Sequence, residues 1–420
     1  MWWLYQASMA LLLALAGPLL LLVRGRHYWP TLPGRLGVRL PAGPRGALWL
    51  HAVSVGEAAV AATLARALPA EEDLVVTTIT PTGQERAARA LAGRAAVAYA
   101  PFELGGPVGR FFDRLAPRAL VLVEGDYWPL LLREAKRRGL PVAVVNGRVS
   151  DRSFPRLRLL RGAVRRLLLE RVDRFGVQTE LDRERLIALG VPAAKIAVTG
   201  NLKFEAPAPA RSPALEAWVE RQAAGRPVLV AGSTMAGEEE AVLDAFAAAG
   251  GARAALLVVA PRHPERFDAV AEECERRFPG VARRSTERDP GAPPAVALLD
   301  TLGELAALYG LARGAFIGGT LVARGGHNPL EPARFGVPVA VGPSMENFRE
   351  IADGFDAEGA WARVGGAAEL GRVWRGWLAE PERARQTGER GRQLIERNRG
   401  ALARTLDLLA PIVARRGGAA

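Results

Sequence analysis

Cysteine is nearly absent from this chain of 420 residues, with Cys274 the single example. A lone cysteine excludes an intramolecular disulfide framework and suits a reducing compartment. The four histidines are scattered and have no cysteine partners at zinc-ligand spacing, so the sequence indicates neither a metal site nor a bound cofactor. The Walker lysine motif, the GxSxG elbow and short-period repeats are also missing, so the sequence gives no sign of the P-loop, α/β-hydrolase or solenoid proteins that they mark.

Acidic residues are the minority, with 44 Asp and Glu against 56 Lys and Arg, a net charge of +12. Such an excess predicts an anionic partner: nucleic acid, a membrane surface or a phosphorylated substrate. Nucleic acid is the least favoured, because the basic residues are not interleaved with aromatic stacking platforms. The length predicts two globular domains. Nothing in the sequence fixes the oligomeric state.

The N-terminus has a long apolar run, Trp2 to Val23, about the ~20 residues that a membrane-spanning helix needs. Basic residues follow the run instead of preceding it: Arg24, Arg26, Arg35 and Arg39. By the positive-inside rule this order predicts a single anchor over residues 1–25 with the bulk of the chain in the cytoplasm. Gly17 and Pro18 leave a helix lying in the membrane interface as the alternative.

From residue 45 onward, short apolar runs alternate with helical stretches. The runs cover residues 47–53, 74–78, 97–100, 119–123, 142–146, 174–178 and 196–200, then 227–232, 254–260, 295–299, 314–319 and 338–342. Continuous apolar strands separated by helices are typical of a buried parallel sheet. We therefore predict an α/β fold of two doubly wound Rossmann-like domains facing a cleft. The expected segments are domains over 45–204 and 215–377, a Pro/Ala hinge over 205–214, and a helical segment over 378–420 packing across both.

One helical stretch, residues 154–174, has Leu and Val on one face and a dense set of arginines around it. A solvated amphipathic helix explains this pattern as well as contact with anionic lipid headgroups does.

After the first strand, Ser54-x-x-Glu57 has the spacing of a capping box, with Ser54 as N-cap. The functional alternative is that Glu57 faces the cleft, where a helix N-terminus would hold its carboxylate ionised to accept a proton from an attacking hydroxyl. Gly56 and the hydroxyls of Thr80 and Thr82 follow neighbouring strands, where they are ordinary caps or ligand contacts.

Glu124 and Asp126 follow another strand, next to Tyr127 and Trp128. This group is either a turn with a core Trp or a polar, aromatic lip for a sugar-like acceptor.

In the second half, the stretch 318–331 (GGTLVARGGHNPLE) joins a strand, paired glycines and a helix start at Asn328-Pro329. Unpaired N–H groups and a helix dipole at such a junction predict an anion-binding loop. Polar residues and paired glycines at successive strand ends converge on the same edge, and together they indicate a nucleotide-bearing ligand: Ser233, Thr234, Arg262, His263, Gly318, Gly319, Asn328 and Glu331. Ser233 and Glu331 have the alternative of simple helix caps.

These motifs resemble the 3-deoxy-D-manno-octulosonic acid (Kdo) transferases of lipopolysaccharide synthesis. The resemblance covers nearly the whole chain after the anchor. It runs through WLHAVSVGE (49–57), TTITPTGQERA (77–87), EGDYWP (124–129), NGRVSDRSF (146–154), QTELDRERLIALG (178–190), TGNLKF (199–204), AGSTMAGEEE (231–240), APRHPERF (260–267) and residues 318–343.

The resemblance implies a GT-B glycosyltransferase fold and a reaction at the cytoplasmic face of the inner membrane. It implies CMP-Kdo as donor, a lipid A precursor as acceptor, inversion at the anomeric carbon and no metal. It makes Glu57 the general base and Ser233, Arg262, Asn328 and Glu331 contacts to CMP. Asn201 and Lys203 would face the cleft, where a cation meets the Kdo carboxylate or a phosphate.

Two other functions fit parts of the sequence. A GT-B transferase that uses a UDP-sugar would fit the second domain but not the motifs of the first. A non-catalytic, membrane-associated binding protein would explain the anchor and the charge but gives Glu57 no purpose.

Overall fold

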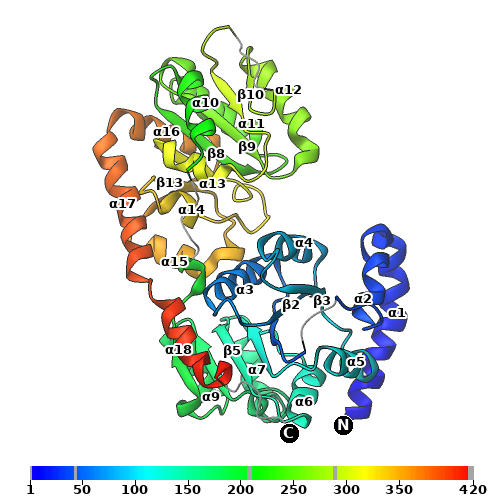
Figure 1. Cartoon of the computed structure of the whole chain (residues 1–420). Coiled ribbons are helices and arrows are strands. Elements are labelled where there is room, and N and C mark those ends of the chain that lie inside the picture. The colour runs from blue at the N-terminus through cyan, green and yellow to red at the C-terminus, as the bar shows by residue number, and fades with distance from the viewer. Residues whose placement is uncertain (1, 42–44, 206–210, 287–290, 415–420) are drawn as a thin grey trace. The chain divides into compact units, whose positions relative to one another are not determined.

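The computed structural model describes residues 2–41, 45–205, 211–286 and 291–414 (Figure 1). The chain forms two compact units, the first made of Met1–Ala206 and Asn398–Ala420 and the second of Pro207–Arg397. The chain therefore passes from one unit to the other twice. The first passage falls within the predicted hinge, of which residues 206–210 lie outside the described residues.

The first unit is built on a seven-stranded sheet of order β3-β2-β1-β4-β5-β6-β7, in which every neighbouring pair is parallel. Its strands are β1 (Leu48–His51), β2 (Leu74–Thr78), β3 (Ala96–Tyr99), β4 (Ala119–Val123), β5 (Val142–Gly147), β6 (Arg174–Val177) and β7 (Ile196–Val198). Its helices are α1 (Trp2–Tyr28), α2 (Leu32–Arg35), α3 (Val55–Ala67), α4 (Pro81–Ala90), α5 (Gly105–Leu115), α6 (Pro129–Arg137), α7 (Phe154–Leu159), α8 (Arg161–Leu167), α9 (Glu180–Ala188) and α18 (Ala401–Val413). Short 3₁₀ turns are η1 (Trp29–Thr31), η2 (Leu169–Arg171), η3 (Ala193–Lys195) and η4 (Leu202–Glu205).

Alternation along the strands divides the core of this unit between the two faces of its sheet. Trp49 points to the face covered by α5 and α6, where its ring centroid lies 5.9 Å from that of Phe111. Leu48 and Leu50 point to the other face, which α3, α4 and α18 cover. Both faces are buried, which explains why the strands read as continuous apolar runs.

The second unit repeats this plan with a sheet of order β10-β11-β9-β8-β12-β13-β14, again parallel throughout. Its strands are β8 (Val228–Thr234), β9 (Leu256–Pro261), β10 (Ala282–Arg283), β11 (Val296–Leu298), β12 (Gly314–Ile317), β13 (Val339–Val341) and β14 (Trp361–Arg363). Its helices are α10 (Pro213–Ala223), α11 (Glu239–Ala248), α12 (Phe267–Arg277), α13 (Leu305–Leu308), α14 (Leu330–Ala333), α15 (Arg349–Ala357), α16 (Ala367–Ala379) and α17 (Pro381–Arg397), with 3₁₀ turns η5 (Gly251–Arg253), η6 (Pro264–Arg266), η7 (Tyr309–Leu311) and η8 (Glu346–Phe348). Residues of α11, α12 and α16, among them Phe246 and Trp374, pack on one face of the sheet.

Each apolar run named from the sequence overlaps a strand of the structure, and the predicted α/β fold of two doubly wound sheets is confirmed. The edge strands β10 and β14, of two and three residues, were not predicted.

The single helix predicted over residues 154–174 is wrong, and the predicted C-terminal helical segment is divided into separate helices. Residues 154–174 form two short helices and a 3₁₀ turn instead of one helix, with a break at Leu160. The C-terminal segment breaks at Glu380, before Pro381, and again before Gly400, whose φ of 89° ends a helix easily. Its two parts belong to different units, α17 to the second and α18 to the first.

The N-terminal run forms α1 over Trp2–Tyr28 and docks on its own unit at its first two turns. The Arg133 and Arg171 guanidinium groups lie 4.7 Å and 5.1 Å from the Trp2 ring centroid, and the Gln6 side chain accepts a hydrogen bond from the Gly105 N–H at the start of α5. Within the described part of the chain, no helix is long and apolar enough to span a bilayer. The transmembrane anchor over residues 1–25 therefore stays a prediction.

Candidate active site

Each sheet has one point where the chain changes direction, and the predicted site residues follow the strands that meet there. In the first unit β1 lies between β2 and β4, and the chain runs outward through β2 and β3 before it returns to β4. In the second unit β8 lies between β9 and β12 in the same way. The carboxyl ends of strands at such switch points are where doubly wound folds bind ligands.

Glu57 lies at the switch point of the first unit, in the first turn of α3. Ser54 is the N-cap of α3, and its hydroxyl oxygen accepts from the Glu57 N–H at 3.3 Å. The Glu57 carboxylate is 6% exposed and accepts from the Val53 N–H at 2.6 Å and from the Ser54 hydroxyl at 2.9 Å. The capping interpretation is thus confirmed for Ser54, while the Glu57 carboxylate bonds one residue before the N-cap.

The environment of Glu57 leaves its carboxyl group near half-ionised at neutral pH. Burial raises its pKa from 4.5 to about 7; the Val53 hydrogen bond lowers it, and the charges of Asp126 and Glu124 raise it further. Desolvation therefore acts against the helix N-terminus, which was predicted to hold this carboxylate ionised. A pKa near neutrality is the value that suits a general base working at neutral pH.

A second group of predicted residues, at the ends of β4 and β7, is joined by a polar network. The Lys203 ammonium lies 2.7 Å from the Glu124 carboxylate, which also accepts from the Asn146 amide at 3.3 Å. Asn146 is completely buried and accepts from the Leu202 N–H at 2.8 Å. The Asn201 amide donates to Gln178, which in turn donates to the Asn146 carbonyl.

The backbone of this network is strained at two positions. Glu124 has a φ of 68° and Asn146 a φ of 55°, the left-handed region that side chains with a Cβ rarely adopt. Strain of this kind persists only where the surroundings impose it, and it gathers at functional sites. The network therefore marks the end of β4 as part of the site.

Other residues of the first set have plainer roles. Thr80 caps α4 by accepting from the Gly83 N–H at 3.1 Å, and Gly83 lies against Ser54. Thr82, Gly56 and Asp126 are exposed. Tyr127 and Trp128 pack against the core, which favours the interpretation of this segment as a turn with a core Trp over an aromatic lip.

In the second unit, the ends of β8, β9 and β12 bring four predicted residues and His327 together. Ser233 has a φ of 58°, and the Arg262 N–H donates to the Thr234 carbonyl at 3.0 Å. Burial, and then the nearby charges of Arg262 and His263, lower the pKa of His327 to about 4, so its ring is neutral at pH 7. Among the described residues, two buried polar atoms here have no hydrogen-bond partner: the Thr234 hydroxyl and His327 Nε2.

The paired glycines Gly318 and Gly319 do not present free amides to a ligand, contrary to the prediction. The Gly318 N–H donates to the Gly232 carbonyl at 2.8 Å, and the Gly319 N–H donates to the buried Glu238 carboxylate at 2.6 Å. A Cβ on Gly318 would overlap the Ser233 carbonyl. Glycine is needed here because the loops after β8 and β12 approach closely. The predicted contact of these two glycines with a nucleotide-bearing ligand stays a prediction.

The expected helix start at Asn328 is also weaker than predicted. The Asn328 side chain accepts from the Leu330 N–H at 3.1 Å, as a cap does, but α14 is only four residues long and supplies little helix dipole. The Asn328 amide also donates to the Glu331 carboxylate at 3.3 Å. Glu331 lies near Tyr309, whose hydroxyl fills the place that a side chain on Gly232 would take.

Sequence analysis gave no role to Asn146, Gln178, Glu238 or His327. Asn146 could have been found, because an asparagine directly after a strand tolerates the left-handed region. Glu238 could not, because it is one of three successive glutamates, Glu238 to Glu240, two of which are buried, and the sequence does not show which of them reaches the loop after β12.

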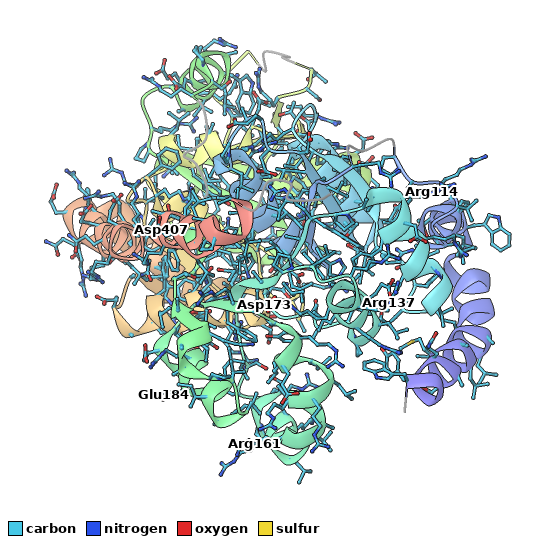
Figure 2. All side chains as sticks on the ribbon, turned by 60° about the horizontal axis from the view of Figure 1, so that its bottom comes forward. Arg114, Arg137, Arg161, Asp173, Glu184 and Asp407 are labelled. Carbon is cyan, nitrogen blue, oxygen red and sulfur yellow. The ribbon has the colours of Figure 1, made fainter. Side chains whose placement is uncertain are left out.

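The first unit also has a cavity of about 440 Å³ at the opposite edge of its sheet. Lys136, Asp173 and Lys195 line it, and each stands at or before the amino end of a strand. Asp173, labelled in Figure 2, pairs with Lys136 at 2.8 Å. This cavity therefore has no part in the candidate site. No cluster of three metal-ligating side chains occurs in the described ranges.

Comparison with known proteins places this chain among transferases. A family model described as 3-Deoxy-D-manno-octulosonic-acid transferase (kdotransferase) matches residues 30–206. The chain is 38% identical over 399 residues to a 3-deoxy-D-manno-octulosonic acid transferase of Bordetella pertussis, covering 91% of each. It is 32% identical over 407 residues to the Haemophilus influenzae protein of that name, covering 94% of each.

Among solved structures, the UDP-GlcNAc 2-epimerase of Neisseria meningitidis aligns with 87% of this chain and all of its own, with a TM-score of 0.57. Its sequence identity of 14% shows the fold alone, a GT-B-like pair of α/β units.

Proposed function

Because the chain belongs to the 3-deoxy-D-manno-octulosonic acid transferase family, we propose that it transfers Kdo from CMP-Kdo to a lipid A precursor in lipopolysaccharide synthesis. The observation that carries the proposal is the buried Glu57 carboxyl group at the β1/β4 switch point, with a pKa raised to about 7.

Glu57 acts as the general base in this proposal. The acceptor hydroxyl gives its proton to the Glu57 carboxylate as its oxygen bonds to the anomeric carbon of Kdo. The bond from that carbon to the phosphate oxygen breaks, and CMP leaves with the electron pair. Attack from the face opposite the phosphate inverts the anomeric carbon. The Val53 N–H and the Ser54 hydroxyl hold the two carboxylate oxygens in place for this proton transfer.

The second unit binds the donor. Arg262 neutralises the phosphate charge that grows as CMP leaves, and the Ser233 and Thr234 hydroxyls add hydrogen bonds. The unpartnered Thr234 hydroxyl and His327 ring nitrogen support this assignment, because buried polar groups without partners cost free energy unless a ligand satisfies them. Asn328 and Glu331 contact the ribose and cytidine part.

The first unit binds the acceptor. Lys203 is its cationic contact, because the side chains of Lys203 and of its partner Glu124 both remain about one-quarter exposed. When the acceptor binds, one of its anionic groups replaces Glu124 as the partner of the Lys203 ammonium. Asn201 and Asn146 hold this pair by hydrogen bonds.

The membrane contact is also a proposal: the protein works at the cytoplasmic face of the inner membrane, attached through α1 and the α7–α8 pair. Leu159 is 86% exposed and Leu160 59%, at the break between the two helices. Exposed arginines stand near them in the sequence: Arg156, Arg158, Arg161, Arg165 and Arg166. Figure 2 shows Arg161 at the outer end of this pair. Exposed leucines among many exposed arginines are typical of segments that bind anionic bilayers.

A vesicle assay tests the membrane contact. The double variant Leu159→Ser/Leu160→Ser should sediment less with vesicles that contain anionic lipid, and Leu302→Ser, an equally exposed leucine of the second unit, should not change. Equal sedimentation of all three proteins would remove α7–α8 from the contact.

A transfer assay in detergent, with chelator present, tests the reaction. Wild type and Glu57→Gln receive a lipid A precursor with CMP-Kdo or with UDP-sugars, and mass spectrometry identifies the product. We expect addition of Kdo by the wild type alone and only from CMP-Kdo. Transfer from a UDP-sugar would support the other GT-B transferase, and no transfer by any protein would leave a binding protein.

A further inference from the structure

Glu238 is the most completely enclosed carboxylate near the donor side, with 0% of its surface exposed. Its Oε2 accepts from the Met235 N–H at 2.9 Å and from the Gly319 N–H at 2.6 Å. Its Oε1 accepts from the Thr320 and Leu321 N–H groups, both at 2.9 Å. One side chain thus joins the loop after β8 to the loop after β12.

The three successive amides of residues 319–321 have the arrangement that proteins use to bind anions. Gly319 has a φ of 71°, and the consecutive N–H groups converge on one point. A phosphate would suit this position, but the chain fills it with its own carboxylate. Four charge-assisted hydrogen bonds compensate the burial of the charge. The shape of the loop therefore does not depend on a ligand.

Further contacts carry this shape to residues of the donor site. The Gly326 N–H donates to the Gly319 carbonyl at 2.8 Å, which closes the loop ahead of His327 and Asn328. The His327 ring lies against Gly319, at 3.1 Å from where a Cβ would stand. On the other side, the Met235 N–H ties down the segment directly after Ser233 and Thr234.

We propose that Glu238 is a positioning residue that holds both donor-side loops in their binding shape before CMP-Kdo arrives. The inference rests on the proposed function, because it names the donor. It also assigns the donor phosphate to side chains, not to the amides of the glycine loop, since Glu238 occupies those amides.

The adjacent Glu239 gives a matched comparison. Glu239 is 2% exposed and belongs to the same helix, but its carboxylate pairs with the Arg266 guanidinium at 2.7 Å, away from both loops. The two side chains are almost equally buried, but Glu238 bonds to the backbone of two loops and Glu239 pairs with Arg266. A general loss of folding on removing a buried charge would affect both variants alike.

The experiment compares Glu238→Gln and Glu239→Gln in the full chain. A glutamine side chain has one oxygen that accepts hydrogen bonds and one NH₂ group that only donates them. In Glu238→Gln, the two backbone N–H groups on the NH₂ side would therefore lose their acceptor. We expect Glu238→Gln to raise the KM for CMP-Kdo and its Kd about tenfold or more. The kcat at saturating donor and the KM for the acceptor should stay near wild type, and Glu238→Asp should recover part of the affinity. Glu239→Gln should bind the donor normally.

Hydrogen exchange measured by mass spectrometry tests the same idea without turnover. In donor-free wild type, amides 319–321 should already be protected, and CMP-Kdo should add little. These amides should exchange faster in Glu238→Gln, and their exchange rate in Glu239→Gln should equal that of the wild type. Wild-type donor affinity in Glu238→Gln, or protection of these amides that appears only with donor, overturns the proposal. If Glu238→Gln does not fold, the exchange of amides 319–321 in the wild type still tests the proposal: protection without CMP-Kdo supports it, and protection only with CMP-Kdo overturns it.

These outcomes separate the two proposals. A wild type that neither binds CMP-Kdo nor transfers Kdo overturns the proposed function, while its amide exchange still reports on Glu238.

Discussion

The two switch points use a buried carboxylate in opposite ways. At β1/β4 the Glu57 carboxylate accepts one backbone N–H and one hydroxyl, has acidic neighbours and has a pKa near 7. At β8/β12 the Glu238 carboxylate accepts four backbone N–H groups and fixes two loops. The same position in the topology thus holds a carboxyl group that can accept a proton in the first unit, Glu57. In the second unit it holds Glu238, which fixes the conformation of two loops. The two carboxylates differ in the hydrogen-bond donors around them: one N–H and one hydroxyl at Glu57, and four N–H groups at Glu238.

Removing the base should produce the largest effect. Glu57→Gln should lower kcat about 10²- to 10⁴-fold, the contribution typical of general base catalysis, with the Kd for CMP-Kdo unchanged. Rapid quench kinetics and a donor titration measure the two quantities.

Glu103 is the control for this variant. Burial also raises its pKa to about 7, but its carboxylate accepts from the Leu130 and Leu131 N–H groups at the start of α6. Glu103→Gln should lower the free energy of unfolding and leave turnover intact. A similar loss of turnover in both variants would show that a buried, raised-pKa carboxyl is no sign of the base.

Crowding at the second switch point should have the next largest effect. In Gly318→Ala the new Cβ meets the Ser233 carbonyl, so the free energy of unfolding should fall by about 1–3 kcal/mol and donor binding should weaken. Gly376 in α16 has open space around it, and Gly376→Ala should stabilise by about 0.5–1 kcal/mol. Chemical denaturation measures both, and a neutral Gly318→Ala would mean that the two loops can move apart.

The pH dependence of turnover should follow the ionisation of Glu57. The base is active when deprotonated, so kcat/KM should fall tenfold per pH unit below about 7 and level off above it. A pH–rate profile between 5.5 and 9 tests this, and a profile flat down to pH 5.5 would contradict the raised pKa.

Stability should show the opposite trend over the same range. The folded state binds the Glu57 proton more tightly than the unfolded chain, where the pKa is 4.5. The contribution of this group to the free energy of unfolding is therefore full below 4.5 and lost as pH rises to about 7. The wild type should lose stability relative to Glu57→Gln across this window.

The smallest effect should come from an acidic neighbour. The charge of Asp126 raises the pKa of Glu57, so Asp126→Asn should shift the pH–rate profile to lower pH with the plateau preserved. Glu72→Gln, at a carboxylate paired with Arg118 near the amino edge of the same sheet, should not shift it. An unshifted profile in Asp126→Asn would show that Asp126 is too solvated to influence the base.

The sequence alone determined much of the fold. Short β-branched apolar runs such as residues 119–123 favour buried strands, and their alternation with helices favours a parallel sheet, because the crossover helices cover both faces. Composition did not locate the breaks at Leu160 and Glu380, because local propensity does not say where packing ends a helix.

The sequence also determined which residues stand at strand ends, and so the candidates Glu57, Lys203 and Thr234. Tertiary structure alone decided what each does there. Desolvation brings the pKa of Glu57 to about 7. The fold also brings Glu124, from the end of β4, next to Lys203, so that the two form an ion pair. Of three successive glutamates, only Glu238 reaches the amides of a loop more than eighty residues away. Burial and long-range hydrogen bonds arise when distant segments meet, and no local pattern records them.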